Sequence, residues 1–308
     1  MSLHAPAGLP LHVLLPLSGG VIYVLGAMLL KRATDLGANV WRTTRLCNFS
    51  SALLFAPLAL LGGAFPGWDF GWQPLLAALL FMAGQVSMLL ALNIGDVSVV
   101  TPVLGLKIPI VAVLTTVLVG ERLGLGLWTA ALLSSVAIAL LNSTRAPSHR
   151  HVGVTILLAT FAASSYALFD VLVQKWTPAW GAGRLLPATM TVVALVSLGL
   201  RPFGRRASVA NNAAAARGTP WLAAGALCIG LQGMLFVSAI ALYGQATVAN
   251  VLYSSRGLWS VLAVWFIGHW FANREQEHGP RVLACRFIGA ALLMAAILIV
   301  LLGAPRHT

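Results

Sequence analysis

Charged residues are scarce in this 308-residue chain, where they make up 8% of the positions and only seven are acidic. Soluble domains carry about 25% charged residues. So few charges cannot cover a surface in contact with water, and the mean hydropathy of +0.90 agrees with this. The shortage of charge excludes an ordinary soluble protein and indicates an integral membrane protein, which we expect in the cell (inner) membrane.

Cysteine is also rare, with three residues, Cys47, Cys228 and Cys285, in or beside apolar runs and without paired spacing. This excludes a disulfide framework and a cysteine metal site. The histidines show no metal-ligand spacing, and no nucleotide loop, catalytic triad or pair of catalytic carboxylates is present. We therefore expect no metal, no cofactor and no enzymatic activity.

Basic residues outnumber acidic ones and give a net charge of +12, but they lie in short connections between apolar runs. A nucleic-acid interface needs a basic patch on a soluble face, and the sequence shows no soluble domain. We interpret the basic residues as topology signals. The N-terminal stretch has no basic segment before its apolar run, so we expect a first membrane helix there rather than a cleaved signal peptide.

Long apolar runs dominate the chain. A helix that spans a membrane needs about 20 mostly apolar residues, and ten segments meet this pattern, of which the seventh is the shortest and most polar. The predicted spans are 11–30, 46–63, 74–93, 98–119, 124–142, 153–173, 185–200, 221–242, 247–272 and 286–303.

The segments also repeat. When two stretches are aligned with one gap, Lys107 falls on Arg256, and an alignment of earlier segments places Tyr23 on Tyr166. Five helices per half is an odd number, so the halves run through the membrane in opposite directions, as in many secondary transporters. We therefore expect an all-α polytopic membrane protein of ten transmembrane helices. Its two inverted five-helix repeats cover residues 1–145 and 146–308.

Two cations interrupt apolar segments at these equivalent positions, Lys107 and Arg256. A charge at the centre of a membrane helix costs about 2.5–3.5 kcal/mol. We interpret the pair as the anion-binding part of a solute site, where a carboxylate or phosphate supplies the countercharge. The alternative is structural pairing with a buried acid or a helix carbonyl end. Of the seven acids only Asp170 lies well inside an apolar run, so at most one cation easily finds a carboxylate there.

The residues near Arg256 favour a site for a polar organic solute. Helical spacing of three and four residues places Tyr253, Trp259 and Ser260 on its face, and Asn250 lies on the same segment. The face of Lys107 is apolar, so its partners must come from other helices. Tyr23 and Tyr166 are further candidates for the lining of the site, with helix packing as the alternative.

Three other residues suggest coupling or gating. Asp170 is a candidate proton-coupling carboxylate, and the alternative is a salt bridge to Lys175 or Lys107. Pro102 and Pro109 flank Lys107 and should kink its helix. A kink frees carbonyl groups for a solute or permits bending, although packing alone also explains it.

Residues 95–141 resemble the EamA-type drug/metabolite transporter superfamily. Gly120 and Glu121 occupy the position of its Gly-Glu motif, and Lys31 and Arg45 fit its basic residues after the first helix and at the start of the second. The resemblance covers nearly the whole chain and implies ten helices, a central cavity and alternating access. It also places Glu121 among the candidate coupling or gating residues.

The second half departs from this motif, because His269 and Trp270 stand where Gly-Glu is expected. The positions of Lys107 and Arg256 resemble the phosphate-translocating and nucleotide-sugar branches, which bind anions with buried lysine and arginine. Other members export amino acids, drugs or other metabolites, so the resemblance specifies a superfamily better than a solute.

We therefore expect a secondary transporter, a monomer or homodimer, that moves a small polar, anionic metabolite by alternating access. Its partners are a small-molecule solute and membrane lipid, with no nucleic acid. The first alternative is a proton-coupled exporter of amino acids or cationic, drug-like solutes in the same fold, coupled through Asp170. The others are a membrane-embedded enzyme that acts on lipid and a non-transporting sensor or subunit.

The orientation predicted from charge conflicts with the resemblance. Members of the superfamily usually keep both termini in the cytoplasm. Here thirteen basic residues lie in connections on the side opposite the termini, against four on the side of the termini. The positive-inside rule assigns the more basic side to the cytoplasm, so we expect both termini outside.

Overall fold

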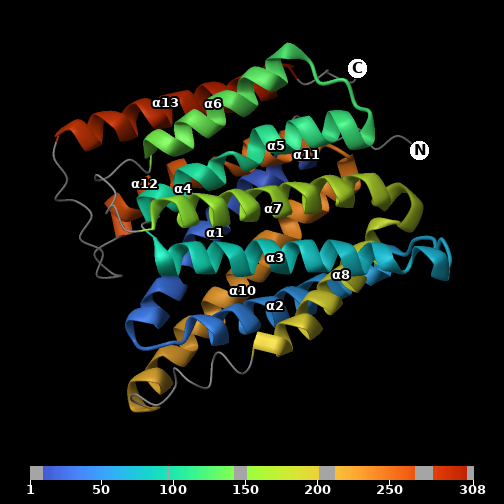
Figure 1. Ribbon diagram of the computed structural model, residues 1–308, viewed down its shortest axis with the longest axis horizontal. Coiled ribbons are helices and arrows are strands. Elements are labelled where there is room, and N and C mark those ends of the chain that lie inside the picture. Colours follow the sequence, from blue (N-terminus) through green and yellow to red (C-terminus); the bar gives the residue numbers. More distant parts are fainter. Residues whose placement is uncertain (1–9, 96, 142–150, 201–211, 268–279, 304–308) are drawn as a thin grey trace.

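The computed structural model describes residues 10–95, 97–141, 151–200, 212–267 and 280–303, and within these ranges the chain is helical and has no strand (Figure 1). In chain order the α-helices are α1 (Leu11–Asp35), α2 (Val40–Phe55), α3 (Trp72–Ile94), α4 (Val97–Gly105), α5 (Lys107–Leu114), α6 (Leu125–Leu141), α7 (Val152–Trp180), α8 (Ala182–Ser197), α10 (Asn212–Tyr243), α11 (Ala246–Tyr253), α12 (Arg256–Ile267) and α13 (Pro280–Gly303). Short 3₁₀ or π segments extend or connect them: η1 (Ala56–Leu61), η2 (Trp68–Phe70), η3 (Thr115–Val119) and η4 (Leu198–Leu200).

Within the described ranges, eight helical segments are long and apolar enough to cross a membrane. They are Leu11–Asp35, Val40–Leu61, Trp68–Ile94, Val99–Val119, Val152–Trp180, Ala182–Leu200, Arg217–Tyr243 and Ala284–Leu302. The fold is thus all-α and its composition is that of a multi-pass membrane protein, while the number ten is not confirmed. The predicted fifth span is a shorter apolar helix of 17 residues, Leu125–Leu141. The predicted ninth is divided into α11 and α12, and its residues 268–272 lie outside the described ranges.

The outer surface of the helices is strongly apolar. Leu60 is 90% exposed, Leu125 is 84% exposed and Phe287 is 79% exposed. Soluble monomers rarely expose large contiguous apolar patches, and each such side chain would lose about 1.5–3 kcal/mol by facing water instead of an apolar medium. The surface therefore suits contact with lipid chains.

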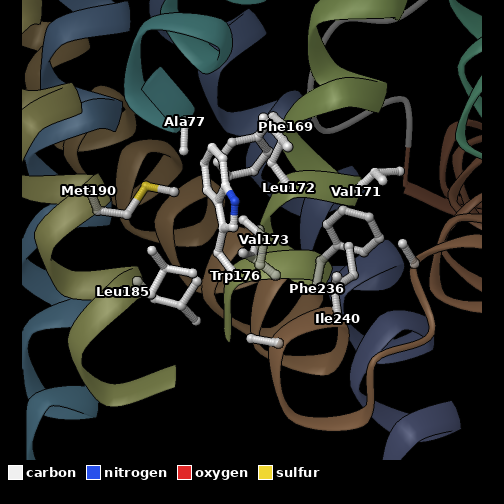
Figure 2. Close-up of a cluster of buried hydrophobic side chains, with 14 of the residues drawn as sticks. Ala77, Phe169, Val171, Leu172, Val173, Trp176, Leu185, Met190, Phe236 and Ile240 are labelled. Carbon is white, nitrogen blue, oxygen red and sulfur yellow. The ribbon is translucent and has the colours of Figure 1, made fainter. Parts of the chain in front are cut away.

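Helix α7 runs through the middle of the bundle and packs on α3, α4, α5, α8 and α10. Its buried side chains form the centre of the main hydrophobic core. In Figure 2, Trp176 of α7 lies beside Leu185 and Met190 of α8, and Phe236 lies near Ile240 of α10. This packing fixes the side of α7 that carries Asp170, four residues before Gln174.

Contacts between helices come in matching pairs. In each pair, the second contact is obtained from the first when each helix is replaced by its counterpart in the other half of the chain. α1 packs on α10 and α7 packs on α3, and α2 packs on α10 as α8 packs on α3. α11 and α12 pack on α1 as α4 and α5 pack on α7. α6 and α13 pack on each other along one edge of the molecule (Figure 1).

The first interruption of a helix lies at Leu106, between α4 and α5, where the sequence predicts a kink. Pro109 has no N–H with which to bond the carbonyl of Gly105 four residues earlier. The hydroxyl of Ser135 on α6 donates to that carbonyl at 2.8 Å instead. The break is therefore stabilised by a neighbouring helix, and Lys107 becomes the first residue of α5.

The second interruption, at Ser254 and Ser255 between α11 and α12, has the same local geometry without a proline. Leu106 N donates to the carbonyl of Val103 at 3.0 Å, and Ser255 N donates to that of Leu252 at 3.1 Å. Each bond joins residues three apart in the sequence, and its donor is the residue directly before the cation. Arg256 is accordingly the first residue of α12, as Lys107 is of α5.

The connection after α2 packs closely against the start of α8 because glycines lie at the contact. A Cβ on Gly183 would lie 2.6 Å from the carbonyl oxygen of Leu58 and still closer to that of Gly62. These are backbone atoms, which cannot turn aside as a side chain can. The segments therefore approach closely because position 183 has no side chain.

Gly183→Ala should lower the thermal midpoint of the purified protein, because overpacking against fixed backbone costs about 1–3 kcal/mol. Gly233→Ala in α10 is the matched control: nothing lies within 4 Å of its added methyl group, and alanine favours a helix over glycine by about 1 kcal/mol. Equal midpoints for the two variants would contradict the close approach.

Candidate functional site

The predicted site residue Lys107 is paired with the predicted coupling residue Asp170. Lys107 Nζ lies 2.7 Å from Asp170 Oδ2, and the amide of Asn250 donates to the same oxygen at 2.7 Å. The carboxylate side chain is 2% exposed and that of Lys107 is 19% exposed. Of the two structural alternatives for Asp170, the structure has the salt bridge to Lys107, while Lys175 is exposed. α5, α7 and α11 meet in this triad.

The second cation, Arg256, is held by aromatic rings. Its Cζ lies 4.5 Å from the ring centroid of Tyr253 and 4.8 Å from that of Tyr23 on α1. Cations are attracted to ring faces at such distances, by about 2 kcal/mol or more where water is excluded. Gly20, three residues before Tyr23, lets α1 approach the hydroxyl of Ser255 and the backbone N of Arg256. The structure thus brings together Tyr23, Tyr253 and Arg256, which are far apart in the sequence.

Both cations lie on one group of rings, which we call the aromatic cluster: Tyr23, Tyr166, Phe236 and Tyr253. Lys107 Nζ lies 5.1 Å from the ring centroid of Phe236 and 5.9 Å from that of Tyr166. Phe236 in turn lies 4.5 Å from Tyr253, measured between ring centroids. The contacts therefore run continuously from Lys107 through Phe236 and Tyr253 to Arg256. Two rings separate the two positive charges.

The structure does not use every predicted residue in this way. Trp259 is 39% exposed and Ser260 is exposed, and the described contacts of Arg256 include neither. Tyr253 is buried against the guanidinium, although the helix that the spacing argument assumed is interrupted at Ser254 and Ser255. Asn250 is buried, and its amide is engaged by Asp170 and by the carbonyl of Ala246 at 2.9 Å.

Two glutamines that sequence reasoning missed complete the polar contacts. The hydroxyl of Tyr253 donates to Gln232 Oε1 at 2.5 Å. Gln174 donates to Glu121 Oε2 at 3.0 Å and accepts from the backbone N of Ala246, at the start of α11, at 2.9 Å. The available signal was a glutamine inside an otherwise apolar run, a costly placement in a membrane unless the amide is bonded.

Gln174→Leu should lower the thermal midpoint in detergent, because it leaves the buried N–H of Ala246 without its acceptor at a cost of about 1–3 kcal/mol. Glu121→Gln is the control, since a glutamine oxygen still accepts from Gln174 and the backbone bond of Ala246 stays. We expect a much smaller change in the control. A change in Glu121→Gln as large as in Gln174→Leu would show that the backbone bond contributes little.

Arg256 has no acidic partner in the described part of the chain. The acids there are Asp35, Asp69, Glu121 and Asp170, and the single salt bridge among them joins Asp170 to Lys107. Two cations therefore share one carboxylate. Within the described ranges no group of three histidine, cysteine or acidic residues is placed to hold a metal ion.

Comparison with known proteins supports the fold alone. No family profile matches the chain, and no curated protein matches it. A solved crystal structure, described only as that of a protein, is 19% identical and superposes with a TM-score of 0.69 over 94% of this chain and 98% of the other. The arrangement of helices along nearly the whole chain is thus one that a solved crystal structure also shows.

Proposed function

We propose that the protein is a secondary transporter of a small anionic metabolite, which binds between Lys107 and Arg256. One observation carries the proposal: both cations contact a single aromatic cluster, and the described residues give them one carboxylate. An unpaired charge among buried groups is costly. A bound anion would supply the missing countercharge.

The positions of the cations suit this role. Each begins a helix directly after an interruption, and transporters bind solutes at interrupted helices near the centre of the membrane. The side chains of Lys107 and Arg256 are also only partly buried, so both stay within reach of a solute. Tyr253, Tyr23 and Phe236 would contact the organic part of the molecule.

The same proposal includes two inverted five-helix repeats of the EamA-type drug/metabolite kind. The paired helix contacts and the two equivalent interruptions support it, because exchange of the halves preserves both. Alternating access would follow if solute binding favours one arrangement of the halves over the other through different contacts. Exchange or an ion gradient would supply the energy.

A specific observation also favours the proton-coupled exporter of cationic or zwitterionic solutes. Asp170 is a buried carboxylate bound to Lys107, and a cationic solute or a proton competes for such a group. In that case Asp170→Asn abolishes transport while substitutions of Lys107 and Arg256 are tolerated. Dependence of anion flux on both cations excludes this alternative.

Flux into sealed liposomes that contain the purified protein tests the proposal. Radiolabelled solutes should include carboxylates, phosphate esters and amines of similar size, each presented with and without a proton gradient and with the same solute inside for exchange. Saturable entry of at least one anion, absent from protein-free vesicles, is expected. Entry of amines alone contradicts an anion carrier, and no flux under any gradient contradicts a transporter.

A further inference from the structure

The charges at the proposed site leave a net excess of one positive charge. Lys107 and Arg256 contribute two, and Asp170 cancels one of them at 2.7 Å. Glu121, in the connection between η3 and α6, bonds to Gln174 of α7 rather than to a cation. A ligand with one negative charge therefore balances the site, whereas a ligand with two leaves a negative excess that a site of low dielectric cannot screen.

The helix ends at the interruptions change this count little. A helix start carries about half a positive charge and a helix end about half a negative charge. At each interruption the end of one helix, α4 or α11, directly precedes the start of the next, α5 or α12. These partial charges largely cancel, so the side chains determine the net charge.

The shape of the site favours a planar anionic group. The rings of Tyr23 and Tyr253 cover Arg256 at 4.8 Å and 4.5 Å from its Cζ. Arg256 forms a side-chain hydrogen bond with Tyr253, but a guanidinium has five N–H donors, so other N–H groups remain for a ligand. Two of those N–H groups match the two oxygens of a carboxylate.

A buried hydroxyl without a partner lies next to this cation. Ser255 is 2% exposed, and its Oγ has no hydrogen-bond partner in the described part of the chain. This oxygen lies 3.2 Å from the position that a Cβ on Gly20 would take, where α1 meets the start of α12. Buried polar groups are nearly always bonded, so an orphaned hydroxyl beside Arg256 indicates a ligand oxygen.

We propose that the solute is a monocarboxylate with an apolar or aromatic body, and that Arg256 and Ser255 bind its carboxylate. The inference rests on the proposed anion site and narrows its substrate class from carboxylate or phosphate to carboxylate. Lys107 and Asp170 stay paired in this state. Asp170 thus acts as a resident anion that limits the charge the site accepts.

Thermal-shift titration of the purified protein tests the inference with three probes that each carry one phenyl ring. Phenylacetate has one negative charge, whereas phenylmalonate and phenyl phosphate have two. At a pH of about 8 the phosphate is mostly a dianion, since its second pKa is about 6. Phenylacetate should bind at least about tenfold more tightly than either dianion, a difference of about 1.4 kcal/mol. Arg256→Gln should lose this stabilisation.

Asp170→Asn raises the net charge of the site by one and should reverse the order, so that phenylmalonate and phenyl phosphate bind better than phenylacetate. If this variant does not fold, the wild-type comparison of phenylacetate with phenylmalonate decides alone. Stronger binding of either dianion to the wild type overturns the inference and leaves the anion site standing. Absence of stabilisation by all three anions, with benzylamine active, overturns the anion site itself.

Discussion

Uptake of the anionic solute should fall to the level of protein-free vesicles when Lys107 and Arg256 are both replaced by glutamine. Hydrogen bonds to charged groups contribute about 1.5–3 kcal/mol each, so loss of both cations should lower anion affinity on the order of 100-fold or more. Glutamine keeps length and polarity but removes the charge. Initial rates of uptake into sealed liposomes measure the effect.

Arg122→Gln is the matched control, because Arg122 is exposed and its substitution removes one positive charge outside the site. The single variants add a finer test. Arg256→Gln should reduce uptake more than Lys107→Gln, since Asp170 already balances Lys107. Wild-type uptake by the double variant, at equal amounts of folded protein, would remove the anion-binding role of the pair.

The second large effect concerns stability. Asp170→Leu alone, or Lys107→Met alone, should destabilise the protein by about 3–5 kcal/mol, because each leaves the other charge of the pair inside the helix bundle without its partner. The double variant removes both charges and should recover most of that loss, since apolar replacements of a buried ion pair are often neutral or stabilising. Unfolding midpoints in detergent, measured for all four proteins, give the coupling energy.

Additive losses in the double variant would show that the 2.7 Å pair contributes no coupling. Asn250→Leu tests the third member of the triad, because it leaves both charges in place and removes the amide that donates to Asp170. We expect a smaller loss of stability there than in either charge variant. The cycle depends on folding alone, so it is independent of the solute.

Sequence reasoning predicted the positions of the main elements because apolar length is a local property. The seventh predicted span, although short and polar, corresponds to Ala182–Leu200. The kink beside Lys107 was also predictable, since Pro109 removes a backbone donor wherever it stands in a helix. The position of the second interruption was not predicted, because Ser254 and Ser255 have no such obligatory effect.

The partners of the cations were predicted only in part. A shortage of acids in apolar runs indicated that one cation at most finds a carboxylate, and the ion pair at 2.7 Å agrees with this. Phe236 and Gln232 were missed, because an apolar ring or a single amide in a long apolar run does not show which way it faces. Their contacts depend on how α10 packs on α1 and α7.

The sequence by itself determined that the chain is a bundle of apolar helices with two isolated cations, since burying charge in lipid is costly in any fold. Only the tertiary structure decided that Asp170 belongs to Lys107 and that Tyr23 and Tyr253 belong to Arg256. These partners come from helices far apart in the chain, and their distances depend on packing between α1, α7, α10 and the interrupted helices. Local periodicity places a residue on a face, whereas packing between helices determines what that face meets.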